Sequence, residues 1–265
     1  MKESLINIFS EENGILRITL DDENNKNALS KAMIGELTEA INAANNNKEV
    51  KVIIIASIGN VFCSGHNLKE ITAARNNNDE GASYFKNLFE LCSSLMQLIV
   101  SCPKPVIAEV GGIATAAGCQ LVASCDLAIS SNTAKFATPG VNIGLFCSTP
   151  MVALSRNVSK KEAMKMLLTG DMIDAVEAKR ISLINDYVSE DKLEESVNNL
   201  ANKISKKSLM TIKIGKEAFY KQYDMSLSDA YEYTSMVMAQ NTLKDDAKEG
   251  ISSFIEKRDP NWKDN

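Results

Sequence analysis

The residues best placed to do chemistry lie in three short segments rich in small side chains. These are VFCSGHNLKE (Val61–Glu70), GGIATAAGCQLVASCDLAI (Gly111–Ile129) and KFATPGVNIGLF (Lys135–Phe146). Each begins in or just after an apolar run and passes through small residues, where a backbone can approach a ligand closely. If His66 ends a turn after a strand and Ala117 opens a helix, their backbone N–H groups can converge. Converging amides of this kind bind a developing oxyanion.

Gln120 places a neutral amide in the middle of a helix that should be buried. An amide has no pKa useful for proton transfer near neutral pH, so Gln120 can orient a water molecule or hydrogen-bond a polar group. It cannot serve as a general acid or base.

Two other side chains, those of His66 and Cys147, can be interpreted either as reactive groups or as groups without a chemical role. His66 is the only histidine, and its ordinary pKa lies near neutrality. We expect its backbone amide to matter and its imidazole to point towards a nucleotide or solvent; the alternative is a general base. Cys147 would be a nucleophile if a positive neighbour lowered its pKa, and otherwise a small apolar wall. A histidine-based metal cluster is excluded with one histidine, and we expect no metal.

Composition narrows the class of protein. The chain has 265 residues, 45% of them hydrophobic, and a formal net charge of -5 with no basic run, which argues against a nucleic-acid partner. The six cysteines form no CxxC pair, so neither a disulfide framework nor a zinc site is indicated. The N-terminal residues are acidic where a signal peptide is apolar, and no run of about 18 apolar residues occurs. These features predict a cytoplasmic protein without a membrane partner.

Strand and helix patterns alternate through the first part of the chain. Residues 15–20 alternate apolar and polar side chains, as in a half-buried strand of an antiparallel hairpin, and residues 29–44 show helical spacing. Continuous apolar runs at 51–57, 105–110 and 125–131 predict strands covered on both faces, with helices at 84–100 and 116–124 between them. This order predicts an α/β fold with right-handed crossovers.

The last third of the chain is predicted to be helical. From Lys160 onward strand signals fade, and helical segments dominate to about residue 240. The tyrosine-bearing segment 229–236 is expected to be a packing or trimer face. Glu109, a charge inside an apolar run, is expected to be paired within the fold or at a subunit contact and not to be catalytic. Asp126, at the start of a strand, is expected to have a structural role.

Taken together, five motifs in order resemble the enoyl-CoA hydratase/isomerase (crotonase) superfamily over essentially the whole chain. They are SGHNLKE, CPKPVIAEVGGIATAAGCQLVASCDLAI, FATPGVNIGL, MLLTGDMIDAVEA and EGISSFIEKRDPNW. The resemblance implies a spiral of ββα units over residues 1–200 and a C-terminal helical region over 201–265 that oligomerises and covers coenzyme A. It further implies a homotrimer or a dimer of trimers, with an acyl-CoA thioester as substrate and no cofactor beyond the coenzyme A that the substrate carries.

The resemblance also assigns residues. The backbone amides of His66 and Ala117 would hold the thioester oxygen, which tolerates alanine at 117 if its φ is negative. The adenine and pantetheine path would be bordered by Lys26, Ala28, Ser64, His66, Asn67 and Leu68. In the last motif Phe254 and Lys257 would close over the coenzyme A of this or a neighbouring subunit.

The two glutamates that hydratases of this family use fall at Gln120 and Gly140 in this chain. General acid or base catalysis contributes roughly 10²- to 10⁴-fold for each group, so the resemblance implies weak classical hydratase activity. We therefore expect an acyl-CoA-binding enzyme that isomerises, hydrates or hydrolyses a thioester through its oxyanion site. The alternative is a non-catalytic acyl-CoA-binding protein.

Overall fold

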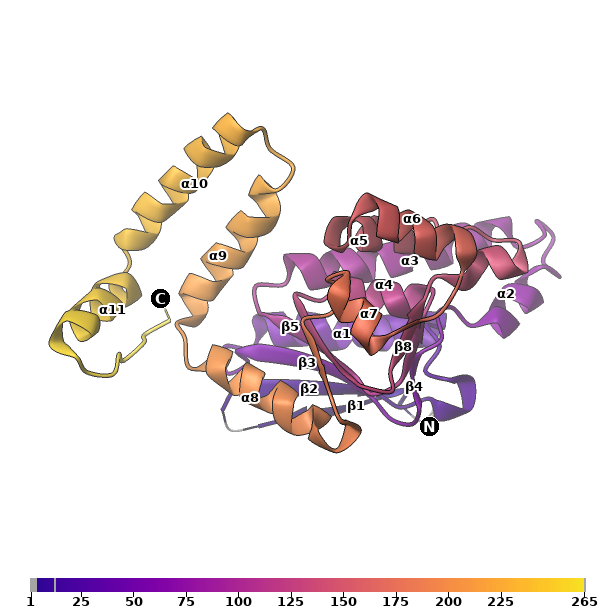
Figure 1. Ribbon diagram of the computed structural model, residues 1–265, viewed down its shortest axis with the longest axis horizontal. Helices are drawn as coiled ribbons and strands as arrows, with labels where there is room; N and C mark the ends of the chain where they lie inside the picture. Colours follow the sequence, from indigo (N-terminus) through magenta and orange to yellow (C-terminus); the bar gives the residue numbers. More distant parts are fainter. Residues whose placement is uncertain (1–3, 12, 265) are drawn as a thin grey trace.

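The computed structural model describes residues 4–11 and 13–264, and its backbone is organised around two sheets (Figure 1). The first sheet has the strand order β1-β2-β3-β5-β7-β10. Its strands are β1 (Ile6–Ser10), β2 (Ile15–Leu20), β3 (Val52–Ser57), β5 (Val106–Val110), β7 (Leu127–Ser131) and β10 (Asp186–Val188). The β1–β2 pair is antiparallel and the other pairs are parallel, which confirms the early hairpin and the three buried strands.

The second sheet is smaller and was not predicted. Its order is β4-β6-β8-β9, formed by β4 (Val61–Cys63), β6 (Ile113–Thr115), β8 (Lys135–Ala137) and β9 (Ile173–Asp174). Strands of two or three residues are too short to show a period in the sequence. With β9 and β10, the segment after Lys160 also contains strand, so the purely helical expectation was incomplete there.

The helices follow the predicted spacing closely where their apolar stripe is strong. In chain order they are α1 (Lys31–Asn46), α2 (Leu68–Ala74), α3 (Ala82–Ser101), α4 (Ala117–Ser124), α5 (Pro150–Asn157), α6 (Lys160–Thr169), α7 (Ala175–Arg180), α8 (Leu193–Ser205), α9 (Leu209–Gln222), α10 (Leu227–Thr242) and α11 (Asp245–Glu256). Three short 3-10 helices complete the set: η1 (Glu23–Asn25), η2 (Pro139–Ile143) and η3 (Glu190–Lys192). The predicted division after residue 200 falls within α8 and stays a prediction.

The apolar core lies on both faces of the first sheet. On one face, α1, α3 and α4 bury their apolar sides together with the second sheet. On the other face, α8 covers the strands with Val197 and Ala201. This second layer also contains an ion pair: Arg17 on β2 donates to Glu109 on β5 at 2.7 Å and to Asn198 on α8 at 2.8 Å. The expected structural partner of Glu109 is therefore Arg17.

Helices α9, α10 and α11, which we call the C-terminal arm, extend away from the sheets (Figure 1). The α9–α10 hairpin projects to one side, and the chain end returns towards the start of α9. Among the described residues, no helix is both long and apolar enough to span a bilayer.

Candidate active site

Three of the sequence segments meet because their strands share an edge of the second sheet. Strands β4, β6 and β8 are parallel neighbours, with Cys63 opposite Ala114 and Thr115 opposite Ala137. Ligands of open parallel sheets bind beyond the carboxyl ends of the strands. The residues that follow these ends are 64–67, 116–120 and 138–140, so the sheet gathers all three predicted segments at one place.

The first two segments are in direct contact. The Thr115 hydroxyl donates to the Ser64 carbonyl at 3.1 Å. A Cβ placed on Gly65 would lie 2.9 Å from Ala116 Cβ and 3.3 Å from the Ala117 nitrogen. Within the described part of the chain, neither the His66 nor the Ala117 backbone N–H donates to another protein group. Two unused donors therefore stand on adjoining loops, as an oxyanion site requires.

Ala117 is the first residue of α4, as predicted, and it lies outside the set of residues with positive φ. The backbone strain falls one residue earlier, because Ala116 adopts φ 51° and ψ −117°. A non-glycine residue with φ above zero is uncommon and carries strain that the surrounding structure must hold. The strained residue thus directly precedes the proposed donor and sets its direction.

Gln120 lies one turn into α4 and is only 4% exposed. Its backbone N–H donates to the Ala116 carbonyl at 3.0 Å, and its Oε1 is buried with no hydrogen-bond partner in the protein. In residues 4–11 and 13–264, no carboxylate hydrogen-bonds to the Gln120 side chain. Position 120 therefore holds a buried amide, as the sequence implies, and no carboxylate is hydrogen-bonded to it.

At Gly140 the surrounding loop leaves no room for a side chain. A Cβ on this residue would lie 2.5 Å from the Leu145 carbonyl oxygen and 2.9 Å from Cys147 Sγ. The segment is held there because Leu145 N–H donates to the Gly140 carbonyl at 2.9 Å and Gly140 N–H donates to Cys147 Sγ at 3.3 Å. Any side chain at 140 would displace this loop.

Cys147 matches its plain interpretation. It is buried against Gly140, and burial raises the pKa of its thiol, opposed by the Gly140 N–H. The nucleophile of cysteine chemistry is the thiolate, which a raised pKa disfavours at neutral pH.

The His66 side chain is half-buried, and its Nε2 is shielded from solvent. Its Nδ1 lies 3.2 Å from the Leu29 carbonyl oxygen, and its ring meets the Phe89 ring edge-on at 5.3 Å. Since only a protonated nitrogen can bond to a carbonyl, Nδ1 carries the hydrogen and Nε2 is an acceptor, buried and unpaired. Burial lowers the pKa of His66, which keeps the ring neutral at pH 7; the Leu29 carbonyl and the Glu70 charge act the other way.

The residues predicted to border coenzyme A come from two contacting segments, one before α1 and one after β4. The Ser64 N–H donates to the Lys26 carbonyl at 3.2 Å, and the Leu29 N–H, next to Ala28, donates to the Gly65 carbonyl at 2.7 Å. Further along, Asn67 caps α2 by accepting from the Lys69 N–H, and exposed Leu68 begins that helix. The structure therefore brings Lys26, Ala28, Ser64, Asn67 and Leu68 together beside His66.

Phe254 and Lys257 are the two predicted residues that the chain does not bring to this place. Phe254 is 85% exposed on α11, and Lys257 ends that helix with φ 55°. Helix α11 and helix α2 lie at opposite ends of the molecule in Figure 1. Of the two arrangements predicted for this pair, closure over the same subunit is absent from this conformation.

Two residues of the site were missed by sequence reasoning. Thr138, 1% exposed, follows β8 and its hydroxyl has no partner in the protein. Asn27 is buried and ties the loop before α1 to the main chain, donating to the Ile58 and Val61 carbonyls at 3.0 and 2.7 Å. The position of Thr138 beside Pro139 could have singled it out, whereas nothing local marks Asn27.

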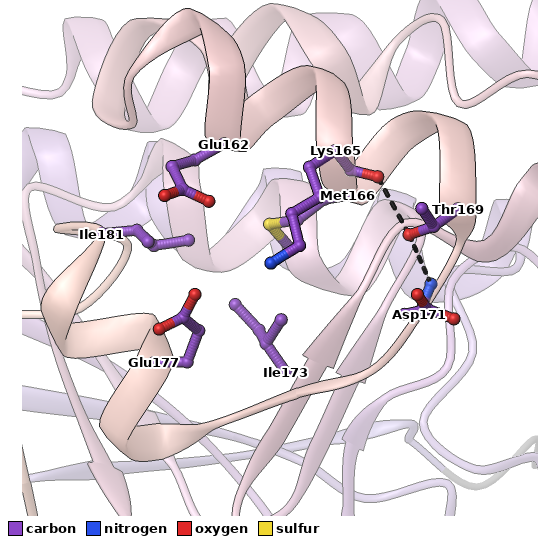
Figure 2. A pocket seen from close by; sticks show the side chains of 8 residues that line it. All are labelled: Glu162, Lys165, Met166, Thr169, Asp171, Ile173, Glu177 and Ile181. Atoms are coloured by element: carbon purple, nitrogen blue, oxygen red, sulfur yellow. Dashed lines mark hydrogen bonds between the residues drawn. The ribbon is translucent and has the colours of Figure 1, made fainter.

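Two surface pockets lie away from the three segments of the candidate site. Figure 2 shows a pocket of about 20 Å³, the size of one water molecule, between α6 and α7; Glu162 and Glu177 line it and Arg180 bridges them at 2.6 Å. A larger one of about 480 Å³ lies between the end of α3 and α9, at Cys102 and Tyr220. Neither is lined by a residue of the three segments.

Comparison with known proteins identifies the family of the chain. A family model described as enoyl-CoA hydratase/isomerase matches residues 10–265. The chain is 47% identical to the mitochondrial enoyl-CoA hydratase domain-containing protein 3 of Xenopus laevis, covering 99% of this chain and 87% of that protein, and 48% identical to its Rattus norvegicus counterpart, covering 95% and 82%.

Solved structures give the same result for the fold. The enoyl-CoA hydratase of Mycobacterium smegmatis superimposes with a TM-score of 0.93 at 42% identity, covering 98% of this chain and 99% of that one. Human enoyl-CoA hydratase domain-containing protein 3 does so at 0.93 and 44% identity, covering 97% and 100%. The predicted α/β crotonase fold with C-terminal helices is confirmed. The sequence of residues 116–126 and 136–150 resembles the enoyl-CoA hydratase domain-containing protein 3 branch of the family. The matches to members of that branch confirm this resemblance.

Proposed function

Because this chain belongs to the enoyl-CoA hydratase/isomerase family, we propose that it binds an acyl-CoA thioester at the carboxyl ends of β4, β6 and β8. The His66 and Ala117 amides would hold the thioester carbonyl oxygen and stabilise the enolate that forms as charge develops on it. The observation that carries this proposal is the pair of unused N–H donors on two contacting loops.

The rest of the proposed site binds the coenzyme and leaves the proton transfer unassigned. Lys26 and Ala28 lie on a segment that hydrogen-bonds to the segment of Ser64, Asn67 and Leu68, next to His66. Gln120 and Gly140 supply no acid or base, so the oxyanion site provides the main rate enhancement. We expect weak hydration of crotonyl-CoA for this reason, with isomerisation or thioester hydrolysis as the other reactions to assay.

The second candidate is a protein that binds acyl-CoA without turning it over. Two observations favour it: Gln120 has no attached carboxylate, and the loop of Leu145 and Cys147 occupies the space beside Gly140. A raised pKa also removes Cys147 as a substitute nucleophile.

An infrared measurement tests the oxyanion site directly. Binding of a carbonyl-labelled butyryl-CoA should shift the thioester C=O band to lower frequency, because two hydrogen bonds polarise the carbonyl. The His66→Ala variant keeps the backbone amide and should keep the shift. An unshifted band in the bound complex would rule out the two-donor site.

Measurement of crotonyl-CoA turnover then distinguishes an enzyme from a protein that only binds acyl-CoA. Robust wild-type hydration of crotonyl-CoA would eliminate the pure binder. Binding without turnover, followed by a gain of about 10²-fold in Gln120→Glu, would support it, since one carboxylate restores one proton-transfer group. Gln97→Glu on the exposed face of α3 is the matched control and should gain nothing. A glutamate at 140 is a poor test because it would displace the Leu145 loop.

For the assembly, we propose a homotrimer or a dimer of trimers in which the arm of one subunit carries Phe254 and Lys257 to the coenzyme A of another. The exposed apolar side chains of the arm support this, among them Phe254 and Leu243. Sedimentation equilibrium tests it: a monomer at micromolar concentration would contradict the proposal.

The compartment remains a prediction. The cytoplasm was expected from the sequence, whereas the names of the two matched relatives include the word mitochondrial. Cell fractionation with an antibody against the protein decides between the two.

A further inference from the structure

The pocket of about 480 Å³ between the end of α3 and α9 has no part in the proposed acyl-CoA site. Small-molecule sites occupy about 300–1,000 Å³, so this pocket is large enough to hold one. One wall is the turn that ends α3, residues 100–103, and the other is a face of α9. The pocket therefore lies where the C-terminal arm leaves the sheets.

Lysines dominate the α9 wall of this pocket. The lining residues of α9 follow the spacing of one helix face, and they are Lys213, Lys216, Glu217, Tyr220 and Lys221. The surrounding segment 203–221 contains six lysines and one glutamate, in a chain whose formal net charge is -5. Positive charge is thus concentrated here against the overall sign of the protein, and such a cleft attracts anions.

The three lysines of the wall differ in whether they have a partner. The Lys216 ammonium donates to Asp126 at 2.6 Å and to two main-chain carbonyls at 3.0 Å, which uses all of its hydrogens. Among residues 4–11 and 13–264, neither Lys213 nor Lys221 forms an ion pair or a hydrogen bond; Lys221 only lies over the Tyr233 ring. Two ammonium groups of the wall are therefore available to a ligand.

A further cation lies next to the other wall and lacks a counter-ion. Lys104 directly follows the lining residues Cys102 and Pro103 and is 3% exposed. Its ammonium donates to the Asn47 and Val50 carbonyls, and within the described part of the chain it forms no ion pair. Burial lowers the pKa of Lys104, because a buried charge without an opposite charge is costly. An anion bound beside Cys102 and Pro103 would offset part of this charge.

The available cations define the chemistry of the ligand. Lysine binds phosphate as a compact point charge, whereas the planar fork that suits a carboxylate belongs to arginine, and no arginine lines the pocket. Lys213 and Lys221 are eight residues apart, which separates their Cα atoms by about 12 Å along α9. A ligand that engages both lysines therefore needs more than one anionic group.

We propose that this pocket is a second binding site, separate from the acyl-CoA site, for a small molecule with two or more phosphate groups. Lys213 and Lys221 hold the phosphates, and Val100, Pro103 and Tyr220 offer apolar surface to the rest of the molecule. Because such a ligand contacts both the end of α3 and α9, its binding also ties the arm to the sheets.

Calorimetric titration with pyrophosphate at fixed ionic strength tests the proposal. Pyrophosphate should bind at least about tenfold more tightly than inorganic phosphate, because a diphosphate offers one group to each lysine. Bound pyrophosphate should also slow hydrogen exchange in α9 and at the end of α3, and leave exchange in α6 unchanged.

The variants assign the binding to the pocket. Lys213→Gln and Lys221→Gln should each weaken pyrophosphate binding at least about fivefold. Ser101→Trp places a large side chain in the pocket without changing the charge, and should abolish binding. Lys160→Gln and Lys161→Gln on exposed positions of α6 are the matched controls for net charge and should leave the Kd unchanged. Melting temperatures check that each variant is folded.

Three results would overturn the proposal. One is the absence of pyrophosphate binding at millimolar concentration, and another is equal weakening by the α6 controls, which would indicate general attraction to positive charge. The third is loss of binding in Lys26→Gln together with full binding in Lys213→Gln, which would place pyrophosphate on the proposed coenzyme A path. None of them affects the acyl-CoA proposal, which the infrared band of the thioester tests separately.

Discussion

The C-terminal arm and the rest of the molecule, which comprises the two sheets and helices α1–α8 and which we call the body, are stabilised in different ways. In the body, α1 buries six apolar residues and α3 buries five. In the arm, the only buried residue of α9 is Ala218, α10 buries none, and α11 buries the polar residues Asp246 and Ser253 (Figure 1). The body makes its own core, whereas the arm leaves large apolar side chains such as Leu243 and Phe254 exposed.

Polar contacts attach the arm to the body at one end. We call them the anchor: Lys216 on α9 donates to Asp126 at 2.6 Å and to two main-chain carbonyls, and the Tyr220 hydroxyl donates to Asp126 at 2.9 Å. The structural role expected for Asp126 is thus explained. Burial, helped by the Asp126 charge, raises the pKa of Tyr220 and keeps its hydroxyl a donor.

A second polar cluster closes the arm on itself, and we call it the clasp. The Asp246 carboxylate, 1% exposed, accepts from the Ser208 hydroxyl and from the Lys263 and Asp264 N–H groups. The Trp262 indole donates to the Lys206 carbonyl at 2.8 Å. The chain end therefore fixes α11 against the start of α9 and with it the direction of Phe254 and Lys257.

The largest effect is expected from breaking the anchor. Asp126→Ala leaves the Lys216 ammonium, whose side chain is 8% exposed, without its counter-ion, and should cost about 3–5 kcal/mol in the free energy of unfolding. Urea denaturation measures it. Glu195→Ala, which removes the exposed pair with Lys192, is the control and should cost less than about 1 kcal/mol. Equal small losses would mean that the anchor does not hold the arm.

Opening the clasp should affect the arm alone. Asp246→Ala removes three hydrogen bonds to a buried carboxylate, each of a kind worth about 1.5–3 kcal/mol before relaxation. Hydrogen exchange should speed up in α11 and leave α1 and α3 unchanged. Asp245→Ala, one residue earlier and exposed, should change neither region. Faster exchange throughout the body would show that the two regions are one cooperative unit.

Relieving strain at the site should stabilise the body. Ala116→Gly removes a Cβ from a residue with φ 51°, and the gain is about 1 kcal/mol once the greater freedom of glycine in the unfolded chain is subtracted. Ala123→Gly in α4, the helix that Ala116 precedes, is the matched control and should cost about 1 kcal/mol. Thermal unfolding compares the two, and the same sign for both would contradict the assignment of strain.

The smallest effect is expected on the pH dependence of stability. It concerns the body and not the arm, because His66 is the only histidine of the chain and lies in the body. Burial lowers the pKa of His66 below its ordinary 6.5, so in the window beneath pH 6.5 the unfolded chain takes up a proton that the folded chain does not. Stability is complete above pH 6.5 and falls as the pH decreases through that window. Melting curves of the wild type and His66→Gln should diverge only there; parallel curves would refute the buried neutral imidazole.

Prediction from the sequence worked where a long stretch shows one period. The strand at Ile15–Leu20 matches its predicted range, and the helix predicted over 84–100 is observed at Ala82–Ser101, because alternation and helical spacing persist over several residues. The second sheet and the helix at Pro150–Asn157 were missed. Strands of two or three residues carry no period, and they exist only because distant segments pair.

For the candidate site, the type of each residue can be read from the sequence, but the groups that surround it in the folded protein cannot. The neutral residues at 120 and 140 and the single histidine follow from the chain alone. The unpaired hydroxyl of Thr138 depends on what packs around it, which no local pattern contains.

The amino-acid sequence by itself determined which groups are available: two amides on small-residue loops, no carboxylate at positions 120 and 140, and apolar faces on the last helices. Only the tertiary structure decided that β4, β6 and β8 end at one edge, that Leu145 fills the space beside Gly140, and that α11 stands far from α2. The physical reason is that side-chain chemistry is local to a residue, whereas strand pairing and packing join segments tens of residues apart.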